Sequence, residues 1–359
     1  MGNGINVDNR DHTLICRTKL RKKCRKFWIM LKKFTLIGLL LNFTVLILCA
    51  QAQKFTFETG KMGSPFRIVV STQDSTGLAK KIKKAFALAE DLENQLSDYR
   101  ENSVVSQINR LAGTGKYFPI SSDFKSILLE SISAQKMTGG SLNVFAGKMV
   151  KAWRKARQTK QLPDSLLMAE VSQNIQGECV QFSKDSTEIR LVNSFCQLDF
   201  GSIGKGFVAQ KVMDFLVSLS CPYVLVDAGG KIVCTQINES GDVWKVGLEL
   251  PQSKNVAPSF LKVQNTSVAT SGKTYQFAEI NGKEYSHVLN PLTGWALTHA
   301  KSATVVIKNG AVSDWLATAA TIVEIEKLKE IISYFKDVKI LVWQNNSGKL
   351  EVVFNHNVL

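Results

Sequence analysis

The segment from Asp199 to Gly206 combines glycines, a carboxylate and a lysine immediately before a helical pattern. At the N-terminus of a helix the backbone N–H groups attract an anion, and Lys205 would add positive charge beside them. The segment is not a P-loop, because Asp199 stands where the first glycine is required and Gly206 where a Mg²⁺-binding hydroxyl is required. The pattern predicts either an anion-binding turn or an ordinary tight turn before a helix.

Asp314 and Thr318 form a second candidate group, four residues apart in an apolar helical pattern. This spacing places both side chains on one helix face, where a carboxylate and a hydroxyl can hold one cation. Two oxygens do not complete the shell of Mg²⁺, so water, substrate phosphates and a backbone carbonyl would supply the rest. The alternative is structural, with an Asp near the start of a helix and a Thr on its surface.

His287 is one of four histidines and lies where a strand pattern runs into the turn Asn290-Pro291-Leu292-Thr293-Gly294. An imidazole at the end of a strand titrates near neutral pH and suits a general base. Taken alone, such a histidine is more often a structural or surface residue.

Strand and helix patterns alternate along the chain and must position these groups. Apolar residues at helical spacing predict helices over Leu78–Gln95 and Phe124–Met137. Asn281-Gly282 between the strand patterns Gln276–Ile280 and Lys283–Leu289 predicts a hairpin. The fold class predicted is α+β, with mixed sheets and packed helices. The other expected elements are strands within Lys54–Thr72 and at Glu188–Val192, Tyr223–Val226, Trp244–Leu250, Phe260–Thr270, Ala303–Ile307, Val338–Trp343 and Leu350–Phe354, and helices at Phe207–Ser218, Ala311–Val323 and Ile325–Phe335.

The size and charge of the chain limit the class of protein to which it can belong. Its 359 residues, 45% of them hydrophobic, suffice for one large α/β domain or two small ones with a substantial core. The net charge is +15, but residues 1–52 supply +8 of it and leave +7 for the remainder. That remainder is only mildly basic and shows no Arg-rich nucleic-acid module, which argues against DNA or RNA as a partner.

Residues 1–52 are predicted to be a targeting segment, followed by one domain over residues 53–359. Lys32 and Lys33 precede an apolar run at 34–48 and then Ala50-Gln51-Ala52, which is the layout of a signal peptide cleaved after Ala52. The apolar run is shorter than a comfortable membrane span.

Two features of this segment leave alternatives open. Met30 is a second candidate for the true start, and Cys49 after the apolar run is a candidate for lipid modification. Either route places the domain on the periplasmic side of a bacterial inner membrane, soluble or lipid-anchored.

Four cysteines lie beyond residue 52, namely Cys179, Cys196, Cys221 and Cys234. None has the CxxC spacing of a metal or redox site, so they are interpreted as buried small hydrophobic residues. In an oxidising compartment, two of them could form one disulfide.

In their order and amino-acid sequence, these segments resemble the ApbE family of FAD:protein FMN transferases. The resemblance runs from about Phe55 to the C-terminus, and seven segments in the same order carry it. They are Gly60-Lys61-Met62-Gly63, Leu96–Arg100 with Ser106 and Asn109, Asp199–Gly206, Ala228-Gly229-Gly230, Ala269-Thr270-Ser271-Gly272, Ser286–Gly294, and Asp314 to Thr318.

The resemblance implies an ApbE-like fold of two intertwined α/β subdomains with FAD as substrate. It implies that Asp314 and Thr318 hold Mg²⁺ together with the backbone carbonyl of Ser202, and that His287 is the base. It also implies a FAD site lined by Met62, Tyr99, Asp199, Lys205 and Leu289, with Ser141, Leu142 and Asn143 near the isoalloxazine or ribityl region.

The reaction implied by the resemblance is in-line phosphoryl transfer from FAD to a Thr or Ser hydroxyl of an exported acceptor protein, with release of AMP. Mg²⁺ and Lys205 would neutralise the pyrophosphate, and His287 would accept the hydroxyl proton. Positioning and charge neutralisation supply most of the catalysis in such chemistry.

Three positions depart from the family pattern, and each lacks a carboxylate that the family commonly has. Asn290 and Asn143 keep hydrogen-bonding capacity without charge, whereas Lys231 reverses the charge. Loss of the carboxylates at positions 290 and 231 would weaken substrate orientation or a second metal position. The alternatives are therefore a divergent paralogue that binds or hydrolyses FAD without modifying protein, or an unrelated solute-binding or structural protein.

Overall fold

The computed structural model describes residues 25, 27, 28, 30–32, 53–236, 243–248, 260–272, 277–299, 301–346 and 349–358. Residues 53–359 form one compact unit, separate from residues 1–52. The apolar run at 34–48 and Cys49 lie outside the described residues, so the predictions of a signal peptide and of lipidation remain predictions. Among the described helices, none is both long and apolar enough to cross a bilayer.

An eight-stranded sheet forms the centre of this unit, in the order β1-β2-β6-β7-β10-β15-β16-β17. Every neighbouring pair in it is antiparallel. The strands are β1 Gln53–Lys61, β2 Ser64–Thr72, β6 Val224–Ala228, β7 Lys231–Cys234, β10 Thr266–Gly272, β15 Lys301–Ile307, β16 Lys339–Asn346 and β17 Lys349–His356. The expectation of mixed sheets is therefore corrected: parallel pairing among the described residues is limited to one isolated bridge, Ala146 with Gln197.

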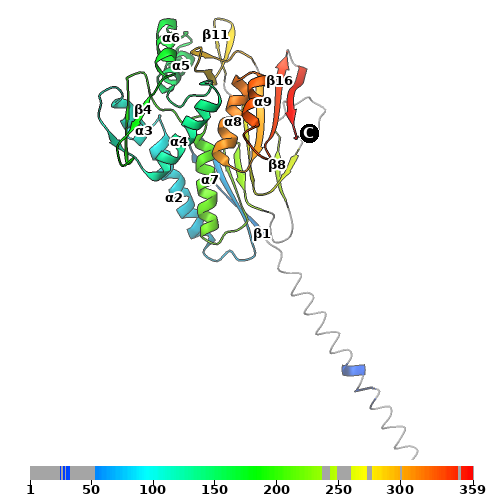
Figure 1. Cartoon of the computed structure of the whole chain (residues 1–359). Helices are drawn as coiled ribbons and strands as arrows, with labels where there is room; N and C mark the ends of the chain where they lie inside the picture. The colour runs from blue at the N-terminus through cyan, green and yellow to red at the C-terminus, as the bar shows by residue number, and fades with distance from the viewer. Residues whose placement is uncertain are drawn as a thin grey trace, which may run out of the picture. The chain divides into compact units, whose positions relative to one another are not determined.

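Three helices cover one face of this sheet, as Figure 1 shows: α2 Leu78–Leu96, α7 Gly204–Ser218 and α8 Gly310–Ile322. Helix α8 lies between α7 and strands β10 and β15, and all of its thirteen residues are buried. Its residues are mostly apolar, and the polar side chains among them, from Ser313 to Thr321, have partners within the protein, so the helix can be enclosed. Its N-terminus is capped by Asn309, whose side chain accepts from the N–H groups of Ala311 and Val312.

The opposite face of the sheet carries a smaller apolar cluster. A two-stranded ribbon, β8 Trp244–Gly247 with β9 Phe260–Val263, packs its buried residues against Val268 and Val306 there. Because side chains alternate along a strand, β10 and β15 contribute to both clusters, the large one under the helices and this small one.

The remaining elements pack at one end of the helix layer. They are helices α3 Val104–Arg110, α4 Ser122–Met137, α5 Gly147–Thr159, α6 Ser165–Asn174 and α9 Ile325–Ile332, the sheet of β3 Phe118–Pro119, β5 Glu188–Leu191 and β4 Val180–Phe182, and the pairs β11 Phe277–Ile280 with β12 Lys283–Ser286 and β13 Leu289–Asn290 with β14 Trp295–Ala296. Trp315 of α8 donates to Glu130 of α4 at 2.9 Å and joins this end to the helix layer.

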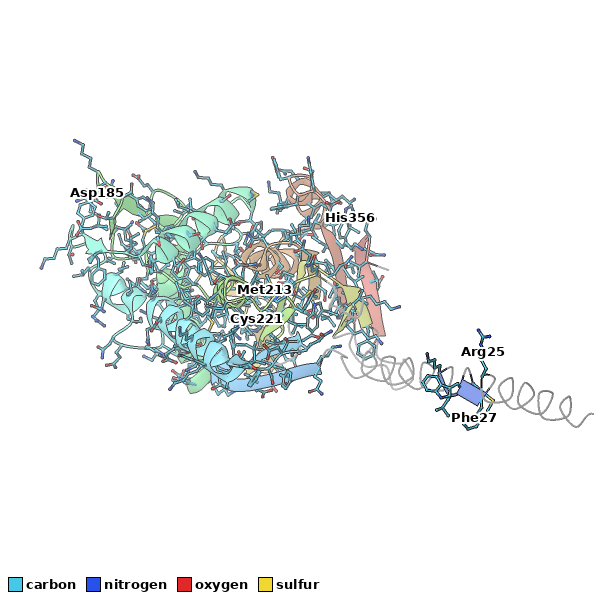
Figure 2. The ribbon with its side chains drawn as sticks, turned by 90° about the horizontal axis from the view of Figure 1, so that it is seen from below. Arg25, Phe27, Asp185, Met213, Cys221 and His356 are labelled. Atoms are coloured by element: carbon cyan, nitrogen blue, oxygen red, sulfur yellow. A yellow bond between two sulfur atoms is a disulfide. The ribbon has the colours of Figure 1, made fainter. Side chains whose placement is uncertain are left out.

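Cys179 and Cys196 form a disulfide beside the small sheet, whereas Cys221 and Cys234 are free and buried. Cys221 and Cys234 are thus buried small residues, as interpreted from the sequence. The single disulfide that the sequence analysis allowed joins Cys179 to Cys196. Figure 2 shows Met213 and Cys221 in the middle of the unit and Asp185 at its edge, in agreement with their burial and exposure.

The helices and strands predicted from periodicity are present, with three differences. The predicted strand Phe260–Thr270 is two strands, because Asn265 adopts a φ of 45° and turns the chain between β9 and β10. The strand expected at Lys283–Leu289 ends at Ser286. Helices α3, α5 and α6 and strands β3, β4, β7 and β14 were not predicted.

Gly206 and Gly310 let α7 and α8 approach so closely that their backbones touch. A Cβ at Gly206 would overlap the carbonyl oxygen of Gly310 and lie 2.7 Å from the Asp314 Cβ. A Cβ at Gly310 would likewise overlap the carbonyl oxygen of Gly206. The glycines are required here by space and not by backbone conformation, since neither has a positive φ.

We expect Gly206→Ala to lower the free energy of unfolding by about 2–3 kcal/mol, because the added methyl group forces two buried helices apart. Gly177→Ala is the matched control, since its Cβ would meet nothing within 4 Å and its φ is not positive. Urea unfolding of both variants measures the difference. Equal stability of the two variants would show that the α7–α8 contact tolerates an added methyl group.

Candidate functional site

The Asp314 carboxylate is the centre of the candidate site. The residue is 1% exposed, and its Oδ2 accepts from the N–H of Gly206 at 2.9 Å. Gly206 is the third residue of α7, so its N–H has no acceptor within the helix, and the bond to Asp314 satisfies it while tying the start of α7 to α8. The interhelix contact of Gly206 and Gly310 is what permits this hydrogen bond.

Two lysines place positive charge around Asp314. The ammonium of Lys231 lies 3.4 Å from Oδ1 of Asp314, and Lys205 at the start of α7 interacts with the same carboxylate. Burial raises the pKa of Asp314, while the charges of Lys231 and Lys205 and the Gly206 N–H oppose that rise. Burial also lowers the pKa of Lys205, against the attraction of Asp314 and Asp227.

Thr318 lies one turn beyond Asp314 on α8, as the sequence spacing predicted. Its hydroxyl donates to the Asp314 backbone carbonyl at 3.2 Å and lies 3.2 Å from the Ser271 hydroxyl of β10. A carboxylate and hydroxyls are hard oxygen donors of the kind Mg²⁺ takes. Among the described residues no group of three or more His, Cys, Asp or Glu side chains is arranged for a metal ion. The donor set therefore fits a Mg²⁺ that keeps water and substrate oxygens in most of its shell.

The turn between β1 and β2 reaches the same helix start. Met62, which has a φ of 52°, places its Cε 3.5 Å from where a Cβ of Gly204 would be. The Lys205 ammonium lies at the same distance from the corresponding position of Gly229, in the Gly-Gly turn after β6. Met62, Lys205 and Asp314 are thus brought together by three segments that are far apart in the chain.

A second group of charges lies around Asp199, at the start of the turn that leads into α7. Arg154 of α5 bonds both oxygens of Asp98 at 3.0 and 3.3 Å, and its guanidinium stacks over the Tyr99 ring at 3.6 Å. The same guanidinium lies 4.0 Å from Asp199. Tyr99 is 74% exposed, so the other side of its ring is open to a planar ligand.

The pKa of Asp199 is raised to about 6. Burial is the main cause and the charge of Asp98 adds to it, while the Gly201 N–H, which donates at 2.7 Å, and Arg154 act in the opposite direction.

The segment Ser141–Asn143 lies beside Asp199, because the Asp199 N–H donates to the Val144 carbonyl. Leu142 and Asn143 are both 8% exposed. The Asn143 amide donates to the Ile175 carbonyl at 2.9 Å, and its oxygen accepts from the Phe145 N–H. An aspartate could not donate that first bond, so the asparagine that departs from the family pattern has a structural role in this chain.

His287 lies between β12 and β13, and its side chain is exposed. The backbone on both sides of it is held in place: the Ser286 N–H donates to Leu297, and the Ser286 hydroxyl accepts from the Val288 N–H. Leu289, two residues beyond, is 8% exposed at the start of β13.

The turn after Leu289 is anchored to α5 and α6. Asn290 accepts from the Leu292 N–H through its side-chain oxygen, a bond that an aspartate could also accept. Buried Trp153 donates to the Gly294 carbonyl at 2.9 Å, and the Ser172 hydroxyl contacts the Pro291 and Leu292 carbonyls. Leu292 in turn lies against Gly140, which precedes Ser141.

Two cavities border these groups without enclosing them. One of about 520 Å³ is lined by Asp98 and Tyr99 together with Asn109, Lys148 and Lys151. The other, of about 750 Å³, is lined by Asp227, Trp244 and basic residues of β1, β2, β8 and β9. Neither includes Lys205 or Asp314 among its lining residues.

The structure therefore brings the predicted residues together in two groups: Met62, Ser202, Lys205, Asp314 and Thr318 around α7 and α8, and Tyr99, Ser141, Leu142, Asn143 and Asp199 beside α5. His287 and Leu289 lie on the loop that borders the second group. Arg154 was not predicted, because nothing in the sequence near it marks it. Lys231 was noted only for its departure from the family pattern, although its place directly after Gly229-Gly230 was a usable signal.

Comparisons of this sequence with protein families and with curated proteins indicate the same family. The ApbE family model matches residues 62–342. The chain is similar to the FAD:protein FMN transferase of Haemophilus influenzae, with 26% identity covering 84% of this chain and 90% of that protein. It is similar to the FAD:protein FMN transferase of Chlamydia muridarum, with 27% identity covering 81% of this chain and 91% of that protein.

Solved structures show the same fold. The flavin transferase ApbE from Vibrio cholerae matches with a TM-score of 0.73 and 23% identity, covering 85% of this chain and 98% of that one. The apo form of the Pseudomonas stutzeri flavinyl transferase ApbE matches with a TM-score of 0.74 and 21% identity, covering 86% and 96%. The predicted α+β fold of ApbE type is confirmed.

We expect Asp199→Asn to change how stability depends on pH. A folded pKa of about 6, above the ordinary 3.8, means that the folded state favours the protonated acid. The parent protein should therefore lose up to about 3 kcal/mol relative to Asp199→Asn as the pH rises from about 4 to about 6. Urea unfolding at several pH values measures this difference, and parallel curves for the two proteins would contradict the assignment.

Proposed function

The chain belongs to the ApbE family, and we propose that it is a FAD:protein FMN transferase that moves FMN from FAD to a Ser or Thr hydroxyl of an exported acceptor protein. The observation that carries the proposal is the buried Asp314 carboxylate, joined to the start of α7 and flanked by two ammonium groups. Such a cluster suits the phosphates of a dinucleotide better than a neutral ligand.

Lys205 and the start of α7 are proposed to bind the pyrophosphate. The ammonium of Lys205 lies at the Gly229-Gly230 turn. The Ser64 side chain fills the space beside Gly229, but nothing lies within 4 Å of where a Cβ of Gly230 would be, so a phosphate can approach the backbone there. The N-terminus of α7 adds the partial positive charge of its helix dipole. Together they would neutralise the charge that builds up as the phosphorus is attacked.

Asp314, the Thr318 hydroxyl and the Ser202 carbonyl are proposed to hold Mg²⁺. When bound, Mg²⁺ supplies positive charge to the phosphate oxygens. The Gly206 hydrogen bond and the glycine contact of α7 with α8 orient the Asp314 carboxylate for this role.

His287 is proposed to accept the proton of the acceptor hydroxyl. Its exposed place between β12 and β13 leaves it open to a second protein. The hydroxyl oxygen forms a bond to the phosphorus on the FMN side, and the bond from that phosphorus to the bridging oxygen breaks. AMP leaves with that oxygen, and the proton is held at the His287 imidazole.

The flavin half of FAD is proposed to lie along the second group of residues. The exposed Tyr99 ring, supported from behind by the Arg154 guanidinium, offers a flat surface for stacking. Ser141–Asn143 and Leu289 border the same region. Asp199 connects the two groups, since it begins the turn that leads to Lys205.

The acceptor protein must share a compartment with the enzyme. The leader-like residues 1–52 support export to the periplasmic side of a bacterial inner membrane, as a soluble or lipid-anchored protein. The disulfide between Cys179 and Cys196 supports the same placement, because disulfides persist in oxidising compartments.

Incubation with FAD, Mg²⁺ and an acceptor domain bearing a Thr tests the transfer directly. The expected products are an acceptor heavier by one FMN, seen by intact mass, and AMP, seen by chromatography. Asp314→Asn should reduce adduct formation by about 100-fold or more, because it removes the one carboxylate of the cluster that can hold the metal. Asp185→Asn, at an exposed carboxylate, should leave the rate unchanged.

The products also decide between transfer and the alternatives. Free FMN and AMP without an adduct on any acceptor would favour a FAD hydrolase. Intact FAD retained by the protein would favour a flavin-binding protein.

We expect His287→Asn to slow transfer by about 100-fold or more while FAD affinity stays within about threefold of the parent, since a general base acts on the hydroxyl and not on the dinucleotide. His356→Asn, on β17, is the matched control. Rates come from intact mass and affinities from flavin fluorescence. Transfer at the parent rate in His287→Asn would rule out this residue as the base.

A further inference from the structure

We propose that the Lys231 ammonium is a built-in cation for the Asp314 carboxylate, so that a divalent metal ion binds at Asp314 only in competition with this side chain. The inference rests on the proposed function for the identity of the ligands, FAD and Mg²⁺. The contact itself is a property of this chain and does not depend on that function.

Lys231 faces the helix layer from the first position of β7. Side chains alternate along a strand, and Val233, two residues on, lies against Gly310 of α8. Lys231 is therefore directed to the same side, and its side chain is only 12% exposed.

The ammonium is held in place by two neighbours. It donates to the Thr270 carbonyl of β10 and lies 3.4 Å from Oδ1 of Asp314. Strands β7 and β10 are paired, with Lys231 opposite Ala269, so the carbonyl and the ammonium belong to adjacent strands. A lysine bound in this way differs from a surface lysine, whose ammonium moves freely in water.

The oxygen that Lys231 approaches is the one a metal ion would need. Oδ2 of Asp314 already accepts from the Gly206 N–H, and Oδ1 faces Lys231. The carboxylate is buried, so it has little water to replace a lost partner. A metal ion at Oδ1 would lie beside the ammonium and be repelled by it unless the ammonium moves away.

Charge balance leads to the same conclusion. Lys205 and Lys231 match Asp227 and Asp314, so these four interacting groups sum to zero without a metal ion. A divalent cation would add two positive charges beside two ammonium groups. Without further anions it would be repelled more strongly than at an acidic cluster.

The phosphates of FAD are the anions that change this balance. Two phosphate charges would compensate the added cation and offer Lys231 another partner. Metal and dinucleotide should therefore bind cooperatively, and each should raise the affinity of the other by the same factor. Lys231 would in this way keep the metal position closed until the substrate arrives.

Titration of the full chain with Mn²⁺, followed by the electron paramagnetic resonance signal of the free ion, tests the competition without any flavin. We expect Lys231→Met to bind Mn²⁺ at least tenfold more tightly than the parent, because the ammonium is gone and Asp314 is exposed to the ion. Lys231→Arg keeps the charge and should bind as weakly as the parent. Lys231→Met combined with Asp314→Asn should lose the gain.

Lys231→Met leaves a buried carboxylate without its partner and is expected to be less stable than the parent. Thermal unfolding gives a second measurement: Mn²⁺ should raise the melting temperature of Lys231→Met by more than that of the parent. A Mn²⁺ affinity that is equal in the two proteins, or a parent that already binds Mn²⁺ tightly through Asp314, would overturn the proposal.

A parallel titration with FAD present separates this proposal from the proposed function. FAD should raise the Mn²⁺ affinity of the parent by a larger factor than that of Lys231→Met, and equal factors would overturn the coupling. If the parent binds no FAD and transfers no FMN, the proposed function fails, whereas the flavin-free Mn²⁺ comparison still decides the role of Lys231.

Discussion

The contact between the backbones of Gly206 and Gly310 is the constraint on which the rest of the site depends. It brings α7 and α8 together closely enough for a backbone N–H of one helix to donate to Asp314 of the other. A single methyl group at either position would separate them. The carboxylate is thus oriented by the packing of two buried helices, which is a more rigid support than a surface loop would give.

Burying Asp314 is costly unless its charge is compensated, and the surrounding elements supply that compensation from several directions. The first turn of α7 provides both the Gly206 N–H and Lys205, and strand β7 provides Lys231. The same kind of compensation occurs around Asp199. There the positive charge of Arg154 offsets the negative charge of Asp98 and part of the free-energy cost of burying Asp199. The two groups are joined by the short turn between Asp199 and Lys205, so a dinucleotide with a charged centre and a flat end suits their arrangement.

The departures from the family pattern have different consequences. Asn143 donates a hydrogen bond that an aspartate could not, and Asn290 accepts one that an aspartate would also accept. Both residues maintain the backbone beside the group of Tyr99 and Asp199. Lys231 has a different effect, because it places a positive charge beside the Asp314 carboxylate, which would bind a metal ion. The first two substitutions preserve the geometry of the loops, and the third changes the electrostatics of the site.

The α+β class, most helices and strands, and the shared helix face of Asp314 and Thr318 could be predicted from the amino-acid sequence, because they follow from local periodicity and from spacing within one helix. The sequence also contains the order of segments that marks the family. The folded structure was needed to show that Arg154 supports Tyr99, that the eight-stranded sheet is antiparallel, and that Lys231 reaches Asp314. Arg154 and Tyr99, Lys231 and Asp314, and paired residues such as Phe66 and Ala228 are far apart in the chain. No local pattern records which of them meet when strands pair and helices pack.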